Sequence, residues 1–273
     1  MHQHILIRTN RLTNGLFAVL ALLVFANFLI SLPYLHRTAE IHGLARLLSL
    51  DGERNLPTAY NVFLLLADAV LLFVIAARAI RGRLVESLGW LTLSIGFVCM
   101  AMDEAWTIHE DLIGPMRQRL GAGHLGLLYN AWILPGIAVA GLIGLAYLRF
   151  LKALPRPTRI GFVLSAFIYL SGALGVEAID GSYFEAHGNN FTYKVLTMVE
   201  EGLEMGGLIL FCRYLLQYIR SQCDSVQFTF SDAVPEPKLK KVKEPATIRR
   251  IPGLEARPDE RIILPADHRR QPE

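Results

Sequence analysis

The chain carries little charge for its length. Of its 273 residues, 19% are charged and 53% are hydrophobic, and the mean hydropathy is +0.38. Soluble globular chains carry about a quarter charged residues, so this deficit argues against an ordinary soluble domain and favours a lipid environment. The net charge is only +3, and the basic residues gather in short loops and one tail. This distribution disfavours a nucleic-acid-binding surface.

Cysteine is equally scarce. The three cysteines are Cys99, Cys212 and Cys223, and the first two lie in apolar runs. No pair has the CxxC or Cys/His spacing of a zinc finger, and their number is too small for a disulfide framework. Neither type of small, crosslinked domain is therefore expected.

Long apolar runs dominate what remains. A bilayer core of roughly 30 Å needs about 20 helical residues to cross it. The first run follows Arg8 and Arg11 and lacks a convincing cleavage site, so we interpret it as an uncleaved helix. The sequence predicts an all-α fold, a six-helix transmembrane bundle, with helices near 14–35, 60–80, 87–112, 126–150, 158–181 and 193–219.

Basic residues predict the orientation of this bundle. They are concentrated in the second-to-third connection, the fourth-to-fifth connection and the tail, and the opposite loops hold fewer. By the positive-inside rule both termini are cytoplasmic. An even number of helices places both termini on the same side of the membrane, so the two arguments agree on an N-in/C-in topology.

Two segments lie outside the predicted spans. Within the membrane domain, 14–220, residues 36–58 have apolar residues at helical spacing and are expected to form an outer amphipathic loop. Residues 1–13 form a cytoplasmic N-terminus. Residues 221–273 are rich in proline and charge, which predicts a disordered cytoplasmic tail that can contact a protein partner.

Acidic residues interrupt three of the predicted spans. The third ends in MDEAWTIHED, the fifth ends in GVEAIDG, and the sixth opens with VEEGLEMGG. An ionisable group inside a spanning helix costs at least ~2.5–3.5 kcal/mol, so such groups usually face the bundle interior and mark function. The residues in these stretches are Asp103, Glu104, His109, Glu110, Asp111, Glu177, Asp180, Glu200, Glu201 and Glu204, and the second span adds Asp68.

These residues are predicted to lie at similar depths. With odd helices running outwards and even helices inwards, all of them fall in the outer leaflet. At about 1.5 Å per residue, Asp68 lies roughly 12 Å, Asp103 about 15 Å and Glu204 roughly 16 Å below the outer ends of their helices. Helical spacing also groups the acids of each helix on one stripe. Together these features predict one acidic site.

The predicted site needs a positive partner. No Lys or Arg lies in the outer halves of these helices, and like charges in a low-dielectric site cannot all stay ionised. Protons, His109 or a metal ion remain. Carboxylates suit a hard divalent ion such as Mg²⁺, Ca²⁺ or Mn²⁺, and an added imidazole allows Fe or Zn. The predicted metal ligands are Asp103, Glu104, His109, Glu110, Glu177, Glu200 and Glu204.

Several of these acids also have a simpler interpretation. Glu110 and Asp111 could be the solvated end of a helix, and Glu200 and Glu201 could be exposed at a helix start, where the macrodipole favours anions. Asp68 could be satisfied by Asn61.

Two motifs carry a resemblance. The pair DExxxxHE and EExxEMxG, here Asp103, Glu104, His109 and Glu110 followed by Glu200, Glu201, Glu204, Met205 and Gly207, resembles a group of uncharacterised bacterial multi-pass membrane proteins. The resemblance implies a bacterial inner-membrane location and no particular activity. The acidic helices more loosely resemble di-iron carboxylate bundles, but the two Glu-x-x-His pairs of that class are missing.

Three functions follow from these observations. The first is a cation site that, with a retained water ligand, performs metal-assisted hydrolysis or redox chemistry on a small molecule or lipid. The second is a non-catalytic assembly or sensory subunit. The third is proton- or cation-coupled transport, for which the inner halves of the helices offer few polar groups.

Overall fold

The computed structural model describes residues 9–32, 41–79, 84–121 and 123–222. Most of the predicted tail and parts of the N-terminus and of segment 36–58 lie outside these residues. The described elements are α1 (Thr9–Ser31), α2 (Ile41–Leu48), α3 (Leu56–Ala79), α4 (Leu84–Trp106), η2 (Glu110–Leu112), α5 (Ile113–Leu120), η3 (Gly126–Leu128), α6 (Ile133–Ala153), α7 (Arg156–Leu170), η4 (Ser171–Val176), α8 (Glu177–His187) and α9 (Phe191–Gln222).

Five helical stretches are long and apolar enough to cross a bilayer. They are α1, α3, α4, α6 and the continuous run from α7 through α8, and they contain 21 to 32 residues each. The chain is therefore a polytopic membrane protein. The sixth predicted span, α9, has 32 residues but is not one of these five, and the count of six remains a prediction.

The outward faces of these helices are apolar. Leu22 on α1, Leu145 on α6 and Phe167 on α7 are 65%, 68% and 69% exposed. Large apolar side chains exposed on every side are compatible with lipid and unfavourable in water. The apolar residues of the sequence thus form the outer surface of the helices, which is compatible with lipid, as well as the buried core.

Helix α9 is the central element of the bundle. It packs against α1, α3, α7, η4 and α8. Its glycines permit the close approach to α7, since a Cβ on Gly207 would lie 2.8 Å from the backbone nitrogen of Tyr169. Helix α9, which carries Glu200, Glu201 and Glu204, therefore packs against protein on several sides, and this packing explains how its carboxylates avoid lipid.

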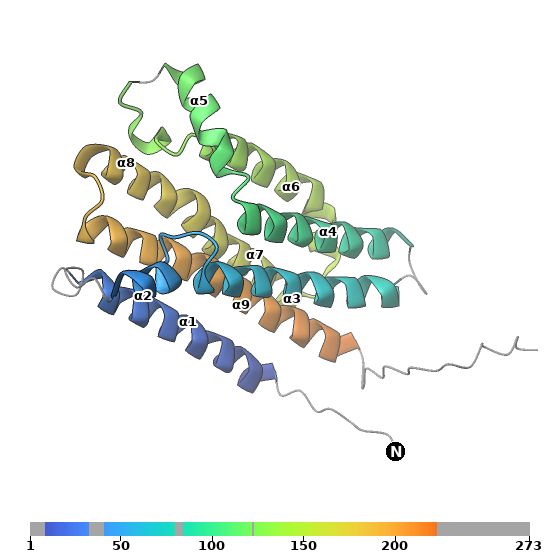
Figure 1. Ribbon diagram of the computed structural model, residues 1–273. Helices are drawn as coiled ribbons and strands as arrows, with labels where there is room; N and C mark the ends of the chain where they lie inside the picture. The colour runs from blue at the N-terminus through green and yellow to red at the C-terminus, as the bar shows by residue number, and fades with distance from the viewer. Residues whose placement is uncertain (1–8, 33–40, 80–83, 122, 223–273) are drawn as a thin grey trace, which may run out of the picture. The chain divides into compact units, whose positions relative to one another are not determined.

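The helix ends fall at two opposite ends of the described bundle (Figure 1). The start of α1, the end of α3, the start of α4 and the end of α9 lie at one end. The end of α4 and the α8–α9 connection lie at the other. The predicted acidic segments belong to this second end.

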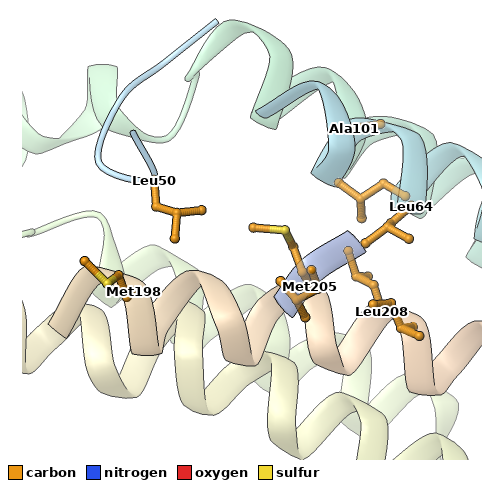
Figure 2. Close-up of a cluster of buried hydrophobic side chains, with 9 residues drawn as sticks. Leu50, Leu64, Ala101, Met198, Met205 and Leu208 are labelled. Carbon is orange, nitrogen blue, oxygen red and sulfur yellow. The ribbon is translucent and has the colours of Figure 1, made fainter. Parts of the chain in front are cut away.

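Two clusters of buried apolar side chains hold the helices together. One joins α3 to α9 through residues that include Leu64, Met205 and Leu208 (Figure 2). The other surrounds Trp90, which contacts the rings of Phe150 and Phe162. We call Leu64, Leu65, Met205, Leu208 and Ile209 the apolar layer, because all five are at most 3% exposed.

The third predicted helix, 87–112, is too long. Helix α4 ends at Trp106, and Glu110 lies in the separate turn η2. The cause is local: Thr107 adopts φ +53°, and the side chain of Asp103 accepts the backbone N–H of His109 at 2.9 Å. A side chain thus replaces the carbonyl that would continue the helix. The prediction that the acids of this helix share one stripe is therefore wrong for Glu110, which lies beyond the end of α4.

The fourth predicted helix, 126–150, also begins later than expected. Residues Gly126–Leu128 form the turn η3, and α6 starts at Ile133. The expected amphipathic segment contains α2, and Leu44 and Leu47 on it are exposed. Its location at the membrane interface stays a prediction.

Candidate functional site

Acidic side chains from four segments come together at one end of the bundle. The strongest electrostatic neighbours of Glu201 are Glu104, Glu53, Glu177 and Asp51. Those of Glu204 are again acidic residues of α4, α8 and α9. We define the carboxylate site as Glu53, Glu104, Glu177, Asp180, Glu200, Glu201 and Glu204.

The site contains a directly paired couple of acids. The side chains of Asp180 on α8 and Glu200 on α9 hydrogen-bond to each other. Asp180 is 3% exposed, and Thr197 Oγ1 donates to its Oδ2 at 3.4 Å. Asp180 Oδ1 and Glu200 Oε2 are buried without a protein donor. Two carboxyl groups can hydrogen-bond only if one of them holds a proton.

Close packing of α9 against η4 places Glu200 and Glu204 here. A Cβ on Gly172 would lie 2.7 Å from the Glu200 carbonyl oxygen and 3.1 Å from Glu204 Cγ. Tyr169 on α7 is an electrostatic neighbour of Glu204. The glycine therefore lets the backbone of one helix reach the acids of the other.

The π-helical turn η4 positions Glu177. This turn spans Ser171–Val176 and Glu177 follows it directly. Turns of this kind are rare and are frequently found at functional sites. Glu177 is 8% exposed and accepts a hydrogen bond from Nε1 of Trp132, in the turn before α6. The indole thus fixes the position of the carboxylate.

Helix α3 contributes a buried amide. The side chain of Asn61 lies beside that of Glu104 on α4. Asn61 is 1% exposed, and its Oδ1 has no hydrogen-bond partner. A polar oxygen is therefore left beside the carboxylate site.

Asp103 and His109 form a dyad at the end of α4. His109 Nδ1 lies 2.9 Å from Asp103 Oδ2, and the ring of His109 lies 4.7 Å from that of Trp132. Burial lowers the pKa of His109, but the hydrogen bond to Asp103 and nearby negative charges, including Glu177, outweigh it and raise that pKa. The Asp103 carboxylate thus stabilises the turn after α4 and also holds the imidazole of His109 in place.

The loop before α3 forms the outermost part of the site. Glu53 hydrogen-bonds to Glu110, and burial together with the charges of Glu110 and Glu104 raises the pKa of Glu53 to about 7. Tyr193 on α9 donates to Asp51 Oδ1 at 2.9 Å. The loop is thereby tied to the start of α9.

The seven sequence-predicted ligands separate into two groups. Glu104, Glu177, Glu200 and Glu204 lie within the carboxylate site, whereas Asp103, His109 and Glu110 lie at its outer edge. Glu110 is exposed. In the part of the chain that the structure describes, no three His, Cys, Asp or Glu side chains are arranged to hold a metal ion. The metal is therefore left as a proposal.

Sequence reasoning missed several partners of these acids. Trp132, Tyr169 and Glu53 are not among the residues that the sequence predicts for the site. Each is brought to the site by tertiary packing, for which a single sequence holds no signal. The glycines beside them offered the one available clue, since they indicate close helix packing.

The fold and the site define a class, namely a polytopic helical membrane protein with a buried carboxylate site. The chain belongs to the family described as a domain of unknown function, DUF8692, whose model matches residues 16–218. No curated protein and no solved structure matches it. Membership of an uncharacterised family is thus confirmed, and the function must be argued from the site.

Proposed function

We propose that the carboxylate site binds cations, and that in this arrangement the bound cations are protons. The observation that carries the proposal is the hydrogen bond between Asp180 and Glu200. One proton held between these two side chains supplies the donor that their buried oxygens otherwise lack. The chain then acts as a membrane protein whose state depends on proton occupancy.

The crowding of charge supports this proposal. The strongest electrostatic neighbours of Glu201 and Glu204 are other carboxylates. Ionising all of them together is unfavourable where water is scarce, so cations must neutralise some of them. Interacting acids of this kind release protons as a group, and the resulting titration belongs to the cluster rather than to one residue.

A hard divalent metal ion is the second candidate. The unpartnered Oδ1 of Asn61 favours it, because amide and carboxylate oxygens are the ligands that such ions prefer. The ion would displace protons from Glu104, Glu200 and Glu204, with Glu177 beside them and Asp103, His109 and Glu110 at the outer edge. These side chains would have to move first, since the described arrangement holds no ready metal group.

The proposed orientation has both termini in the cytoplasm. The start of α1 and the end of α9 lie at the same end of the bundle (Figure 1). That end also carries Arg78, and cytoplasmic ends of spans are enriched in such residues. The carboxylate site then opens towards the outside of a membrane that, by the family resemblance, is the bacterial inner membrane.

The apolar layer bears on the choice between sensing and transport. It lies on α3 and on the part of α9 that follows Glu204, and Figure 2 shows Leu64, Met205 and Leu208 of this layer. A transport path needs polar groups across the membrane, and this layer consists of apolar side chains. We therefore favour a sensory or catalytic role, with proton exchange on one side, over proton-coupled transport.

The test measures both cations on one preparation. Purified wild-type protein and Glu204→Gln are analysed for metal content, and their protonated carboxyl groups are measured by infrared spectroscopy at neutral pH. We expect no stoichiometric metal and a protonated-carboxyl band that weakens in the variant. Stoichiometric metal that Glu204→Gln loses would establish the metal candidate instead. Absence of both metal and band would contradict a cation site altogether.

A further inference from the structure

One further buried acid, Asp68, lies in the middle of α3, away from the carboxylate site. Asp68 is twelve residues after Leu56, roughly 18 Å along the helix at about 1.5 Å per residue. Its exposed fraction is 0%. Both of its carboxyl oxygens lack a nitrogen or oxygen hydrogen-bond partner. A carboxyl group in this situation is rare, because burial of an unpaired polar group is costly.

The group facing Asp68 is a thiol. Cys212 on α9 is 5% exposed, and its thiol is an electrostatic neighbour of the Asp68 carboxyl group. A thiol is a weak donor and a weak acceptor, so it can accompany a neutral carboxylic acid. It cannot replace the water or the cation that an ionised carboxylate needs. The pair therefore joins α3 to α9 without a compensating positive charge.

Apolar side chains enclose this pair along both helices. The apolar layer separates it from the carboxylate site along the chain: Leu64 and Leu65 precede Asp68 on α3, and Leu208 and Ile209 stand between Glu204 and Cys212 on α9. On the far side, Leu72 and Leu215 are 0% exposed within the second core cluster. On α4, the hydroxyl of Ser94 donates to the carbonyl oxygen of Ala69 at 2.8 Å.

We propose that Asp68 and Cys212 form a second proton-binding site, separate from the carboxylate site, in which the Asp68 carboxyl group holds the proton. The inference rests on the burial of Asp68 and on its thiol partner, and it does not depend on the proposed function. In this site the carboxyl O–H and the S–H are neutral partners, and the bound ligand is a single proton. Its release requires that α3 and α9 separate or that water crosses the apolar layer.

Infrared spectroscopy of the full-length protein in lipid tests this site. Asp68→Asn removes the acid with little change in shape, and Cys212→Ser replaces the thiol with a stronger hydrogen-bonding group. We expect a protonated-carboxyl band in the wild type that disappears in Asp68→Asn. The same band should move to lower frequency in Cys212→Ser, because a hydroxyl bonds the acid more strongly.

The chain offers a matched control for the thiol. Cys99 on α4 is exposed, and Cys99→Ser should leave the carboxyl band unchanged. If no band is lost in Asp68→Asn, the acid is ionised and the proposal is overturned. If Asp68→Asn does not fold, the shift in Cys212→Ser decides: a band that stays in place in this variant also overturns it. The outer site remains testable separately, because its bands depend on Glu200 and Glu204.

Discussion

At the residue scale, Glu53 in the loop before α3 should make the free energy of unfolding depend on pH. Burial, and then the charges of Glu110 and Glu104, raise the pKa of Glu53 from 4.5 to about 7. The folded state therefore binds more protons than the unfolded state between these two values. The stabilisation that protonated Glu53 contributes is fully present below pH 4.5 and is lost as the pH rises through about 7.

Glu53→Gln should remove this dependence. We expect the free energy of unfolding in detergent to fall less steeply from pH 4.5 to 7 in the variant, by under about 1 kcal/mol because solvent screens an exposed loop. Glu86→Gln, at the opposite end of α4, should keep the wild-type slope. Equal slopes in wild type and Glu53→Gln would show that the acids crowded around Glu53 do not contribute to the pH dependence of the free energy of unfolding.

The side chain of Asp103 is predicted to stabilise the folded protein. It accepts both the backbone N–H and the Nδ1 of His109 at 2.9 Å, so Asp103→Ala should lower the free energy of unfolding by about 1–3 kcal/mol. Asp111→Ala, on the exposed turn nearby, should change it by less than about 0.5 kcal/mol. Chemical denaturation of both variants makes the comparison, and equal effects would contradict the dyad.

At the scale of elements, the contact of α9 with α7 should tolerate no added methyl group. A Cβ on Gly207 would lie 2.8 Å from the Tyr169 nitrogen and 3.0 Å from the Ser165 carbonyl oxygen. Gly207→Ala should therefore destabilise the bundle by about 1–3 kcal/mol.

Gly202 on the same helix is the control for this prediction. A Cβ there meets nothing within 4 Å, and alanine favours helix by about 1 kcal/mol over glycine. Gly202→Ala should thus be neutral or stabilising in thermal unfolding. A similar loss of stability in both variants would mean that helix flexibility, and not close packing, explains the glycines.

The elements also show how far sequence alone could go. Apolar periodicity and length identified every long helix, because lipid imposes a strong compositional demand. The end of α4 was missed, because the Asp103 side chain stops the helix and hydropathy does not register such a contact. The turn η4 was also missed, because hydropathy does not distinguish a π-helical turn from an α-helix.

At the scale of the whole described bundle, the proposed topology has a direct consequence. Both termini should be on the cytoplasmic side, while His124, in the connection before α6, should face outwards. Single cysteines placed at position 124 and in the tail, in a chain without its native cysteines, can be labelled in intact cells with an impermeant reagent. Position 124 should react and the tail should not. The reverse pattern would place the carboxylate site on the cytoplasmic side.

The sequence predicted the depth of the acids, but it held no signal for their facing or their chemistry. Depth along the predicted spans put Asp68, Asp103 and Glu204 at one level, but Asp68 lies apart from the carboxylate site, because depth does not determine which way a side chain faces. The assignment of Glu104, Glu177, Glu200 and Glu204 to one functional site stays a prediction. The sequence could not show that Asp180 pairs with Glu200, because the facing of α8 towards α9 depends on packing. Nor could it distinguish protons from a metal ion, because the same carboxylates bind both.

The most direct test of the central claim is the proton shared by Asp180 and Glu200. Infrared spectra at neutral pH are compared for wild type, Glu200→Gln and, as a control, Asp111→Asn on the exposed turn η2. The account predicts that Glu200→Gln loses the intensity of one protonated carboxyl group, since the amide of Gln can donate to an ionised Asp180. Asp111→Asn should retain that intensity. Identical protonated-carboxyl intensity in wild type and Glu200→Gln would contradict the account.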